Sequence, residues 1–371
     1  MNPFWTREQI YFDSDEYFRD VLSSIDSALH TVEMETYIFE RGILADRFCN
    51  ALIRAVKRGL TVRLLIDGVG SSGFVADLEP TLAAGGVLVR YYRVLPWIIR
   101  HLPGEPKGWF LSFIYRLSRL NKGNHRKMCL IDKKTLWVGS ANVSDVHLKE
   151  IYGDNAWRDL GVCVEGDEVD LARRAFDNAF NNGRSLQLKI RMPRLLAINQ
   201  TYFQRRRRRA AQWRRLKRAH ERIWIQTPYF VPLGRVSRRL IRAARSGIDV
   251  RVMVPAQSDV WVVPWISYSY LWLLDSNGVK VFEYQPKFLH QKLYLMDQWI
   301  CLGSTNLNNR SFLHDLEIDV VITEPQNKIT LESQFTEDQK QSIRFDGKLW
   351  NSFPIWKKAS FWILRSFSYW S

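Results

Sequence analysis

The chain has 371 residues, and its 54 Lys and Arg against 38 Asp and Glu give a formal net charge of +16. A hydrophobic fraction of 46% is enough for a full core and excludes an intrinsically disordered protein. The positive charge favours a polyanionic partner, either nucleic acid or an anionic membrane, and the 15 tryptophans suit a membrane interface.

The first half of the chain alternates predicted strands and helices. Residues 27–39 read as a strand that ends in a Tyr/Phe-rich turn. Residues 52–66 read as the end of a helix, with Gly59 as its cap, followed by a second strand. A further strand ends at Tyr92, and a strand–turn–strand motif, HRKMCLIDKKTLWVGSAN, then occupies residues 125–142.

The second half repeats this order. Residues 218–230 parallel the first strand, residues 240–254 parallel the helix and second strand, and the motif returns at 290–306 as HQKLYLMDQWICLGSTN. Both copies read His-x-Lys-x4-Asp, then Gly-Ser-x2-Asn; the second copy has one residue fewer before its Gly-Ser. Strands that alternate with helices predict parallel-rich sheets covered by helices. We therefore expect an α/β fold of two similar sandwich halves related by a pseudo-twofold axis.

Each motif places a histidine and a lysine on one face of a strand. His125 and Lys127 are two residues apart, as are His290 and Lys292, so each pair points the same way. The residues that follow are apolar on both faces, which predicts a buried strand with its polar start at the sheet edge. A twofold axis near these ends would bring both pairs into one site between the halves.

Two facing imidazoles suit a two-step displacement at phosphorus. One must be neutral to attack, and the other must be protonated to donate to the leaving group. Two lysines and nearby Ser and Asn side chains would surround a tetrahedral phosphate with donors, and the attacking nitrogen would form a phosphohistidine. No metal-ligand set accompanies the motifs and the four cysteines lack zinc spacing, so we expect neither a metal nor another cofactor.

The paired motifs resemble those of the phospholipase D superfamily. Over residues 10–325, the strings ETYIF, NHRKMCLID, WRDLGVCVEG, TPYFVP, the SD at 258–259, and GSTNLNNRSF with LEIDVVI resemble bacterial cardiolipin synthases more narrowly. The resemblance implies two phospholipase D-like halves with the active site between them. It also implies a phosphatidyltransferase that forms cardiolipin from phosphatidylglycerol, with phosphatidylglycerol or another phospholipid as the second lipid.

Carried onto this sequence, the resemblance implies that one motif histidine is the nucleophile and the other the general acid. The first-copy histidine is the usual nucleophile in relatives, but the sequence leaves the order open. The motif aspartates lie five residues past the lysines on the opposite strand face, so structural pinning is favoured for them over chemistry. The catalytic motifs comprise His125, Lys127, Asp132, His290, Lys292 and Asp297.

A second set of residues would support the reaction. With the two motif lysines, Ser140, Asn142, Ser304 and Asn306 would hold the phosphate. The resemblance also implies that Asp159 of WRD and Glu317 of LEID orient the catalytic imidazoles through their other nitrogen, as a buried acid does in a hydrolase triad.

The repeat divides the chain into two halves, a basic connection and a tail. Tyr92 precedes His125 by 33 positions whereas Tyr284 precedes His290 by six, so the first half carries an insertion. The predicted parts are a first half at 1–183 with an aromatic–basic insertion at 93–122, a basic linker or helix at 184–217, a second half at 218–345, and an aromatic–basic tail at 346–371.

Three of these features favour lipid over nucleic acid. The insertion and the tail contain blocks of aromatic residues mixed with Leu and Ile, and residues 203–218 carry basic residues without interleaved acids. A helix packed on the core is the alternative for the first two, and a solvated face for the third. A nuclease would instead space single aromatics along a basic groove for base stacking. We expect the insertion to lie at the mouth of the site, with its arginines on lipid phosphates.

The expected partners are therefore anionic phospholipids and a membrane surface, not nucleic acid. The longest nearly uncharged run, residues 260–274, is too short to span a bilayer. These features predict a peripheral enzyme on the cytoplasmic face of the cell membrane, without a transmembrane span. Two alternatives stay open: a phospholipase D that hydrolyses phospholipids to phosphatidic acid, and a nuclease or nucleic-acid-binding protein of the same superfamily. The sequence leaves the oligomeric state undetermined.

Overall fold

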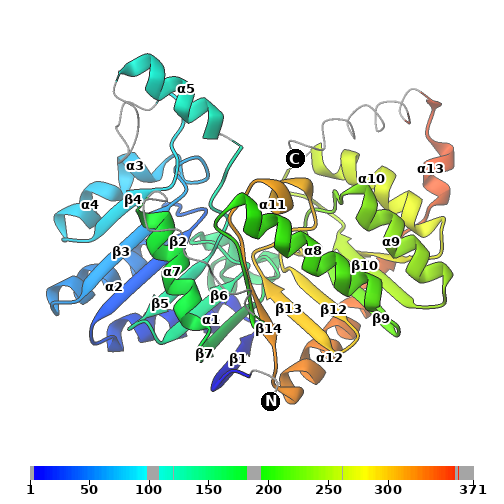
Figure 1. Cartoon of the computed structure of the whole chain (residues 1–371), viewed down its shortest axis with the longest axis horizontal. Coiled ribbons are helices and arrows are strands. Elements are labelled where there is room, and N and C mark those ends of the chain that lie inside the picture. Colours follow the sequence, from blue (N-terminus) through cyan, green and yellow to red (C-terminus); the bar gives the residue numbers. More distant parts are fainter. Residues whose placement is uncertain are drawn as a thin grey trace.

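The computed structural model describes residues 4–97, 108–119, 121–181, 194–260, 262–355 and 358. It has two α/β halves that lie side by side, with the first half at the left of Figure 1 and the second at the right. Each half is built around one mixed β-sheet with helices outside it. The predicted α/β class with two similar halves is confirmed.

The first half contains a seven-stranded sheet in the order β1-β7-β6-β5-β2-β3-β4. Strands β2, β3 and β4 are parallel, and β5 runs antiparallel to β2 as the first strand of the motif hairpin. The strands are β1 (Arg7–Tyr11), β2 (Thr31–Thr36), β3 (Thr61–Ile66), β4 (Leu88–Tyr91), β5 (Met128–Ile131), β6 (Thr135–Gly139) and β7 (Gly161–Glu165).

The second half contains an eight-stranded sheet in the order β15-β11-β10-β9-β12-β13-β14-β8. Its run from β14 to β11 matches the run from β7 to β4 strand for strand, so the sequence repeat is a repeat of topology. The strands are β8 (Leu196–Ile198), β9 (Arg222–Gln226), β10 (Asp249–Pro255), β11 (Lys280–Tyr284), β12 (Leu293–Met296), β13 (Trp299–Gly303), β14 (Ile318–Ile322) and β15 (Ser342–Arg344).

The helices lie on the outer faces and in the connections (Figure 1). Those of the first half are α1 (Ser14–Ser27), α2 (Ile43–Lys57), α3 (Phe74–Asp77), α4 (Glu79–Ala84), α5 (Trp109–Arg119), η1 (Asp145–His147), α6 (Lys149–Tyr152), η2 (Gly153–Asn155) and α7 (Val169–Phe180). Those of the second half are α8 (Tyr202–Arg218), α9 (Gly234–Arg245), α10 (Val262–Asp275), α11 (Asn309–Leu313), α12 (Pro325–Lys340) and α13 (Lys348–Ser352).

The motif strands are buried on both faces, as their continuous apolar sequences predict. Along β5, Met128 and Leu130 join a core shared with the second sheet, whereas Cys129 and Ile131 face the core under α1 and α2. The equivalent strand β12 alternates in the same way. Because successive side chains leave opposite faces of a strand, each motif strand stabilises both its own half and the contact between halves.

The segment predicted as a basic linker belongs, in its described part, to the second half. Strand β8 forms the edge of the second sheet beside β14, and Thr201 caps the start of α8 with a side chain that accepts a hydrogen bond from the Gln204 N–H. On α8, the buried Arg208 forms an ion pair with Asp319, and Arg215 lies 4.4 Å from the centre of the Trp299 ring. Part of the basic run therefore stabilises the fold, and only the remainder is available to a partner.

The insertion and the tail are described in part. Helix α5, which Figure 1 shows projecting from the body of the first half, is the described helix of the insertion; residues 98–107 and 120 lie outside the described residues. The tail begins with α13, whose Trp350 stacks on Trp272 of α10 at 5.1 Å. The rest of the predicted interfacial tail, residues 356, 357 and 359–371, lies outside the described residues. No helix within the described ranges combines the length and apolar character needed to cross a membrane.

Candidate active site

The two motifs meet in one cavity of about 380 Å³ between the halves. His125 and Asn142 line it from the first half, and His290 and Asn306 line it from the second. Each motif is fixed by the backbone of the other half: the His125 N–H donates to the Leu316 carbonyl at 2.9 Å, and the His290 N–H donates to the Arg158 carbonyl at 2.8 Å. The docking of the halves therefore sets the relative position of the two histidines.

The carboxylates predicted to orient the imidazoles do so across the halves. His125 Nδ1 lies 3.1 Å from Glu317 Oε2, and His290 Nδ1 lies 2.7 Å from Asp159 Oδ1. All four side chains are buried. A carboxylate on Nδ1 fixes the ring and its tautomer, which leaves Nε2 for chemistry. Each half thus supplies one histidine and holds the histidine of the other half.

The two motif serines lie behind the carboxylates. The Ser140 hydroxyl donates to Asp159 at 2.6 Å and accepts the N–H of the residue that follows this aspartate. The Ser304 hydroxyl likewise donates to Glu317 and accepts the Ile318 N–H. Neither serine lines the cavity. Their predicted role as phosphate donors therefore differs from their observed contacts, because their hydroxyl protons already serve the orienting carboxylates.

His147 is a member of the site that sequence reasoning missed. Its Nδ1 lies 2.6 Å from Asp159 Oδ2, and its Nε2 accepts the Asn142 N–H at 3.1 Å. In the second half Ser311 holds the matching place, since its hydroxyl accepts the Asn306 N–H at 3.3 Å. Both residues follow the motif asparagine of their half by five positions, and this shared spacing is the sequence signal that could have identified His147. Asp159 is therefore shared by two imidazoles, whereas Glu317 holds one.

This difference separates the two carboxylates electrostatically. Burial works to raise the pKa of Asp159, but its two imidazole partners, His147 and His290, hold it well below its usual range. Burial raises the pKa of Glu317 to about 7, against the opposing charge of Lys127. At neutral pH Asp159 is ionised, whereas Glu317 can hold a proton.

Burial also controls the basic groups next to the cavity, whose lining includes neither motif lysine. Burial, followed by the charges of the lysines, lowers the pKa of His125 and of His290 well below the usual range, so both rings are neutral. Burial lowers the pKa of Lys127 to about 8 and that of Lys292 to about 7. The Lys292 Nζ lies 2.9 Å from the His290 Nε2, so the lysine is placed beside the nitrogen that would react.

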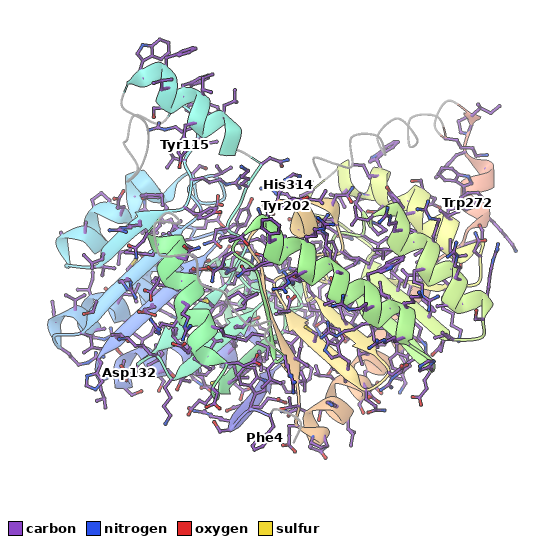
Figure 2. All side chains as sticks on the ribbon, viewed as in Figure 1. Phe4, Tyr115, Asp132, Tyr202, Trp272 and His314 are labelled. Carbon is purple, nitrogen blue, oxygen red and sulfur yellow. The ribbon has the colours of Figure 1, made fainter. Side chains whose placement is uncertain are left out.

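The motif aspartates lie at the other ends of their strands, away from the histidines. Asp132 accepts the backbone N–H groups of residues 29–31, and Asp297 accepts those of residues 220–222. Figure 2 shows Asp132 at the outer edge of the first half. Burial alone would raise the pKa of both carboxyls, but the hydrogen bonds from these N–H donors hold it below the usual range. Their contacts tie each motif hairpin to the start of the neighbouring strand in its sheet, β2 or β9, in agreement with structural pinning.

One group of described residues has a composition suited to a metal ion. The side chains of His147, Asp159 and His290 offer ligand atoms within 4.8 Å of one another. The same atoms are at hydrogen-bonding distances, with each Nδ1 directed at one oxygen of Asp159. A carboxylate that accepts two N–H bonds explains this geometry without an ion.

The wall of the cavity carries aromatic and charged residues. Tyr37 and Tyr229 come from equivalent turns after β2 and β9, and the Tyr37 ring lies 5.0 Å from that of His125. The Tyr229 hydroxyl donates to Asp259 at 2.8 Å. Trp157 packs 5.1 Å from the His290 ring. The cavity can therefore shield a polar reaction while offering carboxylates to a hydroxylated headgroup.

Two repeated α/β halves that place paired His–Lys motifs in one cavity define a phospholipase D-like enzyme. The chain belongs to the family described as cardiolipin synthase, PLD-like domain, whose model matches residues 21–169 and 213–339. The predicted resemblance is confirmed, and membership of this family identifies the chain as a phosphatidyltransferase of phospholipid biosynthesis.

Curated relatives and solved structures agree with this assignment. A cardiolipin synthase of Clostridium perfringens (strain SM101) is 30% identical over 349 residues, which cover 89% of this chain and 70% of that protein. A cardiolipin synthase of Listeria monocytogenes (strain HCC23) is 29% identical over 364 residues, covering 94% and 72%. The phosphatidylserine synthase of Haemophilus influenzae Rd KW20 matches with a TM-score of 0.65 at 15% identity, covering 97% of this chain and 92% of its own, which shows a shared fold.

Proposed function

We propose that this enzyme forms cardiolipin by transferring the phosphatidyl group of one phosphatidylglycerol to the headgroup hydroxyl of a second. The observation that carries the proposal is the pair of crossed His–carboxylate contacts in one cavity, since each carboxylate holds its imidazole by Nδ1 and reserves Nε2 for the reaction. The cardiolipin synthases among its relatives support the choice of lipid. Exchange of one phosphodiester for another needs no nucleotide.

In the first step, the Nε2 of one neutral histidine attacks phosphorus. A nitrogen–phosphorus bond forms as the bond from phosphorus to the headgroup glycerol breaks, and the other histidine donates a proton to the departing oxygen. In the second step, that histidine takes the proton of an acceptor hydroxyl, whose oxygen attacks phosphorus and releases the first histidine. The anionic phosphate favours the protonated imidazole that the first step requires.

The phosphate would be held by Lys127, Lys292, Asn142 and Asn306. The Asn142 side-chain oxygen accepts the Ile38 N–H at 3.2 Å, which leaves its amide N–H groups for an anion. The two lysines would neutralise the charge that develops on the phosphoryl oxygens. The proposal is tested by incubation with labelled phosphatidylglycerol: cardiolipin and free glycerol support transfer, whereas phosphatidic acid alone would indicate hydrolysis.

Chelation is expected to leave activity unchanged, because lysines take the place of a metal in stabilising the transition state. The measurement is cardiolipin formation by enzyme dialysed against EDTA, with a mock-dialysed sample as the control. Loss of activity that one divalent ion restores would contradict the metal-free mechanism and direct attention to the group of His147, Asp159 and His290.

Activity is expected to fall as pH rises above neutrality. A lysine carries its positive charge below its pKa, so Lys292 at about 7 and Lys127 at about 8 lose affinity for phosphate as pH passes these values. The ratio kcat/KM should then fall roughly tenfold per pH unit between pH 7 and pH 8 and roughly a hundredfold per unit above pH 8, where both lysines lose their charge. The fall in kcat should come at higher pH, because bound phosphate raises both pKa values. A kcat/KM profile that stays flat to pH 9 would contradict the lysine assignment.

We propose further that α5 docks the enzyme on the membrane. Its apolar residues point outward, with Trp109 81% and Phe110 58% exposed, whereas its polar Ser112 and Arg116 are 4% and 7% exposed. A helix packed on a core has the opposite arrangement. This pattern argues against the alternative of a packed insertion and suits an interfacial helix.

The prediction that the arginines of the insertion bind lipid phosphates is wrong for the two whose side chains the structure describes. Arg93 is buried and forms an ion pair with Asp67 at 2.9 Å, and Arg116 is buried as well. Neither faces a lipid, contrary to the prediction that they bind lipid phosphates. The Arg93 ion pair instead ties the start of the insertion to the body of the first half.

Replacement of Trp109, Phe110 and Phe113 by Ser is expected to weaken binding to phosphatidylglycerol vesicles about tenfold or more, because it removes the exposed apolar face. It should also raise phosphatidic acid relative to cardiolipin, since water gains access, while turnover of a soluble short-chain substrate stays nearly unchanged. Vesicle sedimentation and product analysis provide the measurements.

The matched control is the triple replacement of Phe4, Leu29 and Ile329 by Ser. These residues are also exposed, and Figure 2 shows Phe4 at the end of the molecule opposite α5. If the α5 variant and the control bind vesicles equally well and give equal product ratios, α5 does not dock the enzyme.

A further inference from the structure

A second cavity, of about 340 Å³, lies beside the active site between α8 and α9. Its floor is apolar and includes Trp213, Leu216, Leu233 and Val236, together with Phe312 of α11. Arg206, Arg209 and Arg235 also line it, and none of its described lining residues is acidic. The catalytic mechanism uses none of these side chains.

The arginines of this cavity differ from the structural arginines of the same helix. Arg208 is neutralised by Asp319, whereas Arg206, Arg209 and Arg235 form no ion pair with a carboxylate in the part of the chain that the structure describes. Along α8, positions 206, 209, 213 and 216 recur at helical spacing and form one stripe along the cavity. Three guanidinium groups without a carboxylate partner among the described residues therefore line a cavity that has an apolar floor.

The start of α9 adds to the positive potential of this cavity. Leu233 occupies the N-cap position without a side-chain hydrogen bond, and the first turn contains no acidic residue. Helix N-termini present free N–H groups and the positive end of the helix dipole. Together with the arginines, this end of α9 suits an anion, whereas the floor suits a hydrocarbon chain.

The cavity shares a wall with the active site. In the segment 306–312, Asn306, Asn308 and Ser311 line the catalytic cavity, while Leu307 and Phe312 line the second one. Leu307 is anchored through its N–H to the Thr227 hydroxyl at 3.2 Å. A ligand that packs on Leu307 and Phe312 would thus support the segment that carries Asn306, a proposed phosphate ligand.

We infer that this cavity binds an anionic phospholipid outside the catalytic centre, with part of an acyl chain on the apolar floor and the phosphate at the three arginines. The choice of a phospholipid rests on the proposed function, while the chemistry of the site requires only an anionic amphiphile. The two requirements, apolar chain and anion, distinguish it from a simple phosphate site.

The test is calorimetric titration with octyl phosphate below its micelle concentration, with octyl glucoside and inorganic phosphate in separate arms. Octyl phosphate should bind about tenfold more tightly than either, since only octyl phosphate has both an apolar chain for the floor and an anion for the arginines. Replacement of Arg206, Arg209 and Arg235 by Gln should weaken binding about tenfold or more, and Ala210→Trp, which fills the cavity, should weaken it similarly.

The matched control replaces Arg207, Arg214 and Arg238 by Gln, which removes the same charge from exposed positions on α8 and α9 that do not line the cavity. Binding by this control should stay within about twofold of the unmodified enzyme. Equal weakening in both triple variants would mean general charge attraction and overturn the inference. Equal binding of inorganic phosphate would also overturn it.

A Lys292→Ala enzyme separates this cavity from the catalytic one. Octyl phosphate binding should persist in that variant, and loss there with retention in the cavity variants would place the probe in the active site and overturn the inference. Because binding is measured without turnover, an enzyme that binds the probe but makes no cardiolipin would refute the proposed function alone.

Discussion

Replacement of His125 or His290 by alanine is expected to lower cardiolipin formation by about a thousandfold or more. One ring supplies the nucleophile and the other the proton transfer, and general acid–base catalysis alone contributes roughly 10²–10⁴. The two rings enter the cavity from segments that precede β5 and β12, so their loss should leave the fold intact. Product analysis with labelled phosphatidylglycerol and thermal unfolding of each variant are the measurements.

The two variants should differ on an activated substrate. A good leaving group needs little protonation, so only the variant that lacks the general acid should keep activity on a p-nitrophenyl phosphodiester. The exposed His220 serves as the control, and His220→Ala should behave as the unmodified enzyme. Substantial activity of both His125→Ala and His290→Ala on natural lipid would refute the two-histidine mechanism.

The duplicated fold follows from the sequence because it depends on local patterns. The apolar runs after Lys127 and Lys292 predict strands buried on both faces, and β5 and β12 are such strands between two cores. The repeated order of strand and helix predicts two similar halves, and the sheets share the same central strand order. Periodicity of 2.0 and 3.6 residues is sufficient for these conclusions.

The contacts that complete the site could not be predicted in the same way. Glu317 reaches His125 from 192 positions along the chain, and this pairing depends on how the two sheets dock. Ser140 and Ser304 are of a residue type that binds phosphate, but their hydroxyl groups donate hydrogen bonds to the buried carboxylates instead. Competition among buried polar groups for partners is a property of packing, and no local spacing records it.

The roles of the individual arginines of α8 also could not be predicted from the sequence. A cluster of arginines without acids predicts an exposed, anion-binding face, yet Arg208 is buried against Asp319. The acid that neutralises it lies on β14, more than a hundred positions away. Sequence therefore identified the charge of α8, whereas the structure separates the arginines that stabilise the fold from those that line the second cavity.

The crossed carboxylates lead to a second prediction of large effect. Glu317→Gln and Asp159→Asn should each lower kcat on natural lipid by about 10²–10⁴, because a neutral amide no longer holds the correct imidazole tautomer or stabilises its protonated form. The replacements preserve side-chain shape, so unfolding temperatures should change little. Glu324→Gln and Asp154→Asn, at exposed positions, are the matched controls.

The pattern on the p-nitrophenyl diester then tests which carboxylate serves which histidine. If pairing crosses the halves, Glu317→Gln should behave as His125→Ala does, and Asp159→Asn as His290→Ala does, whichever histidine is the acid. His147→Ala should follow the His290 pattern with a smaller effect, because His147 acts through its contacts with Asp159 and the Asn142 backbone and not on phosphorus. The reverse assignment, with each carboxylate matching the histidine of its own half, would contradict the docking of the two halves from which the site is built.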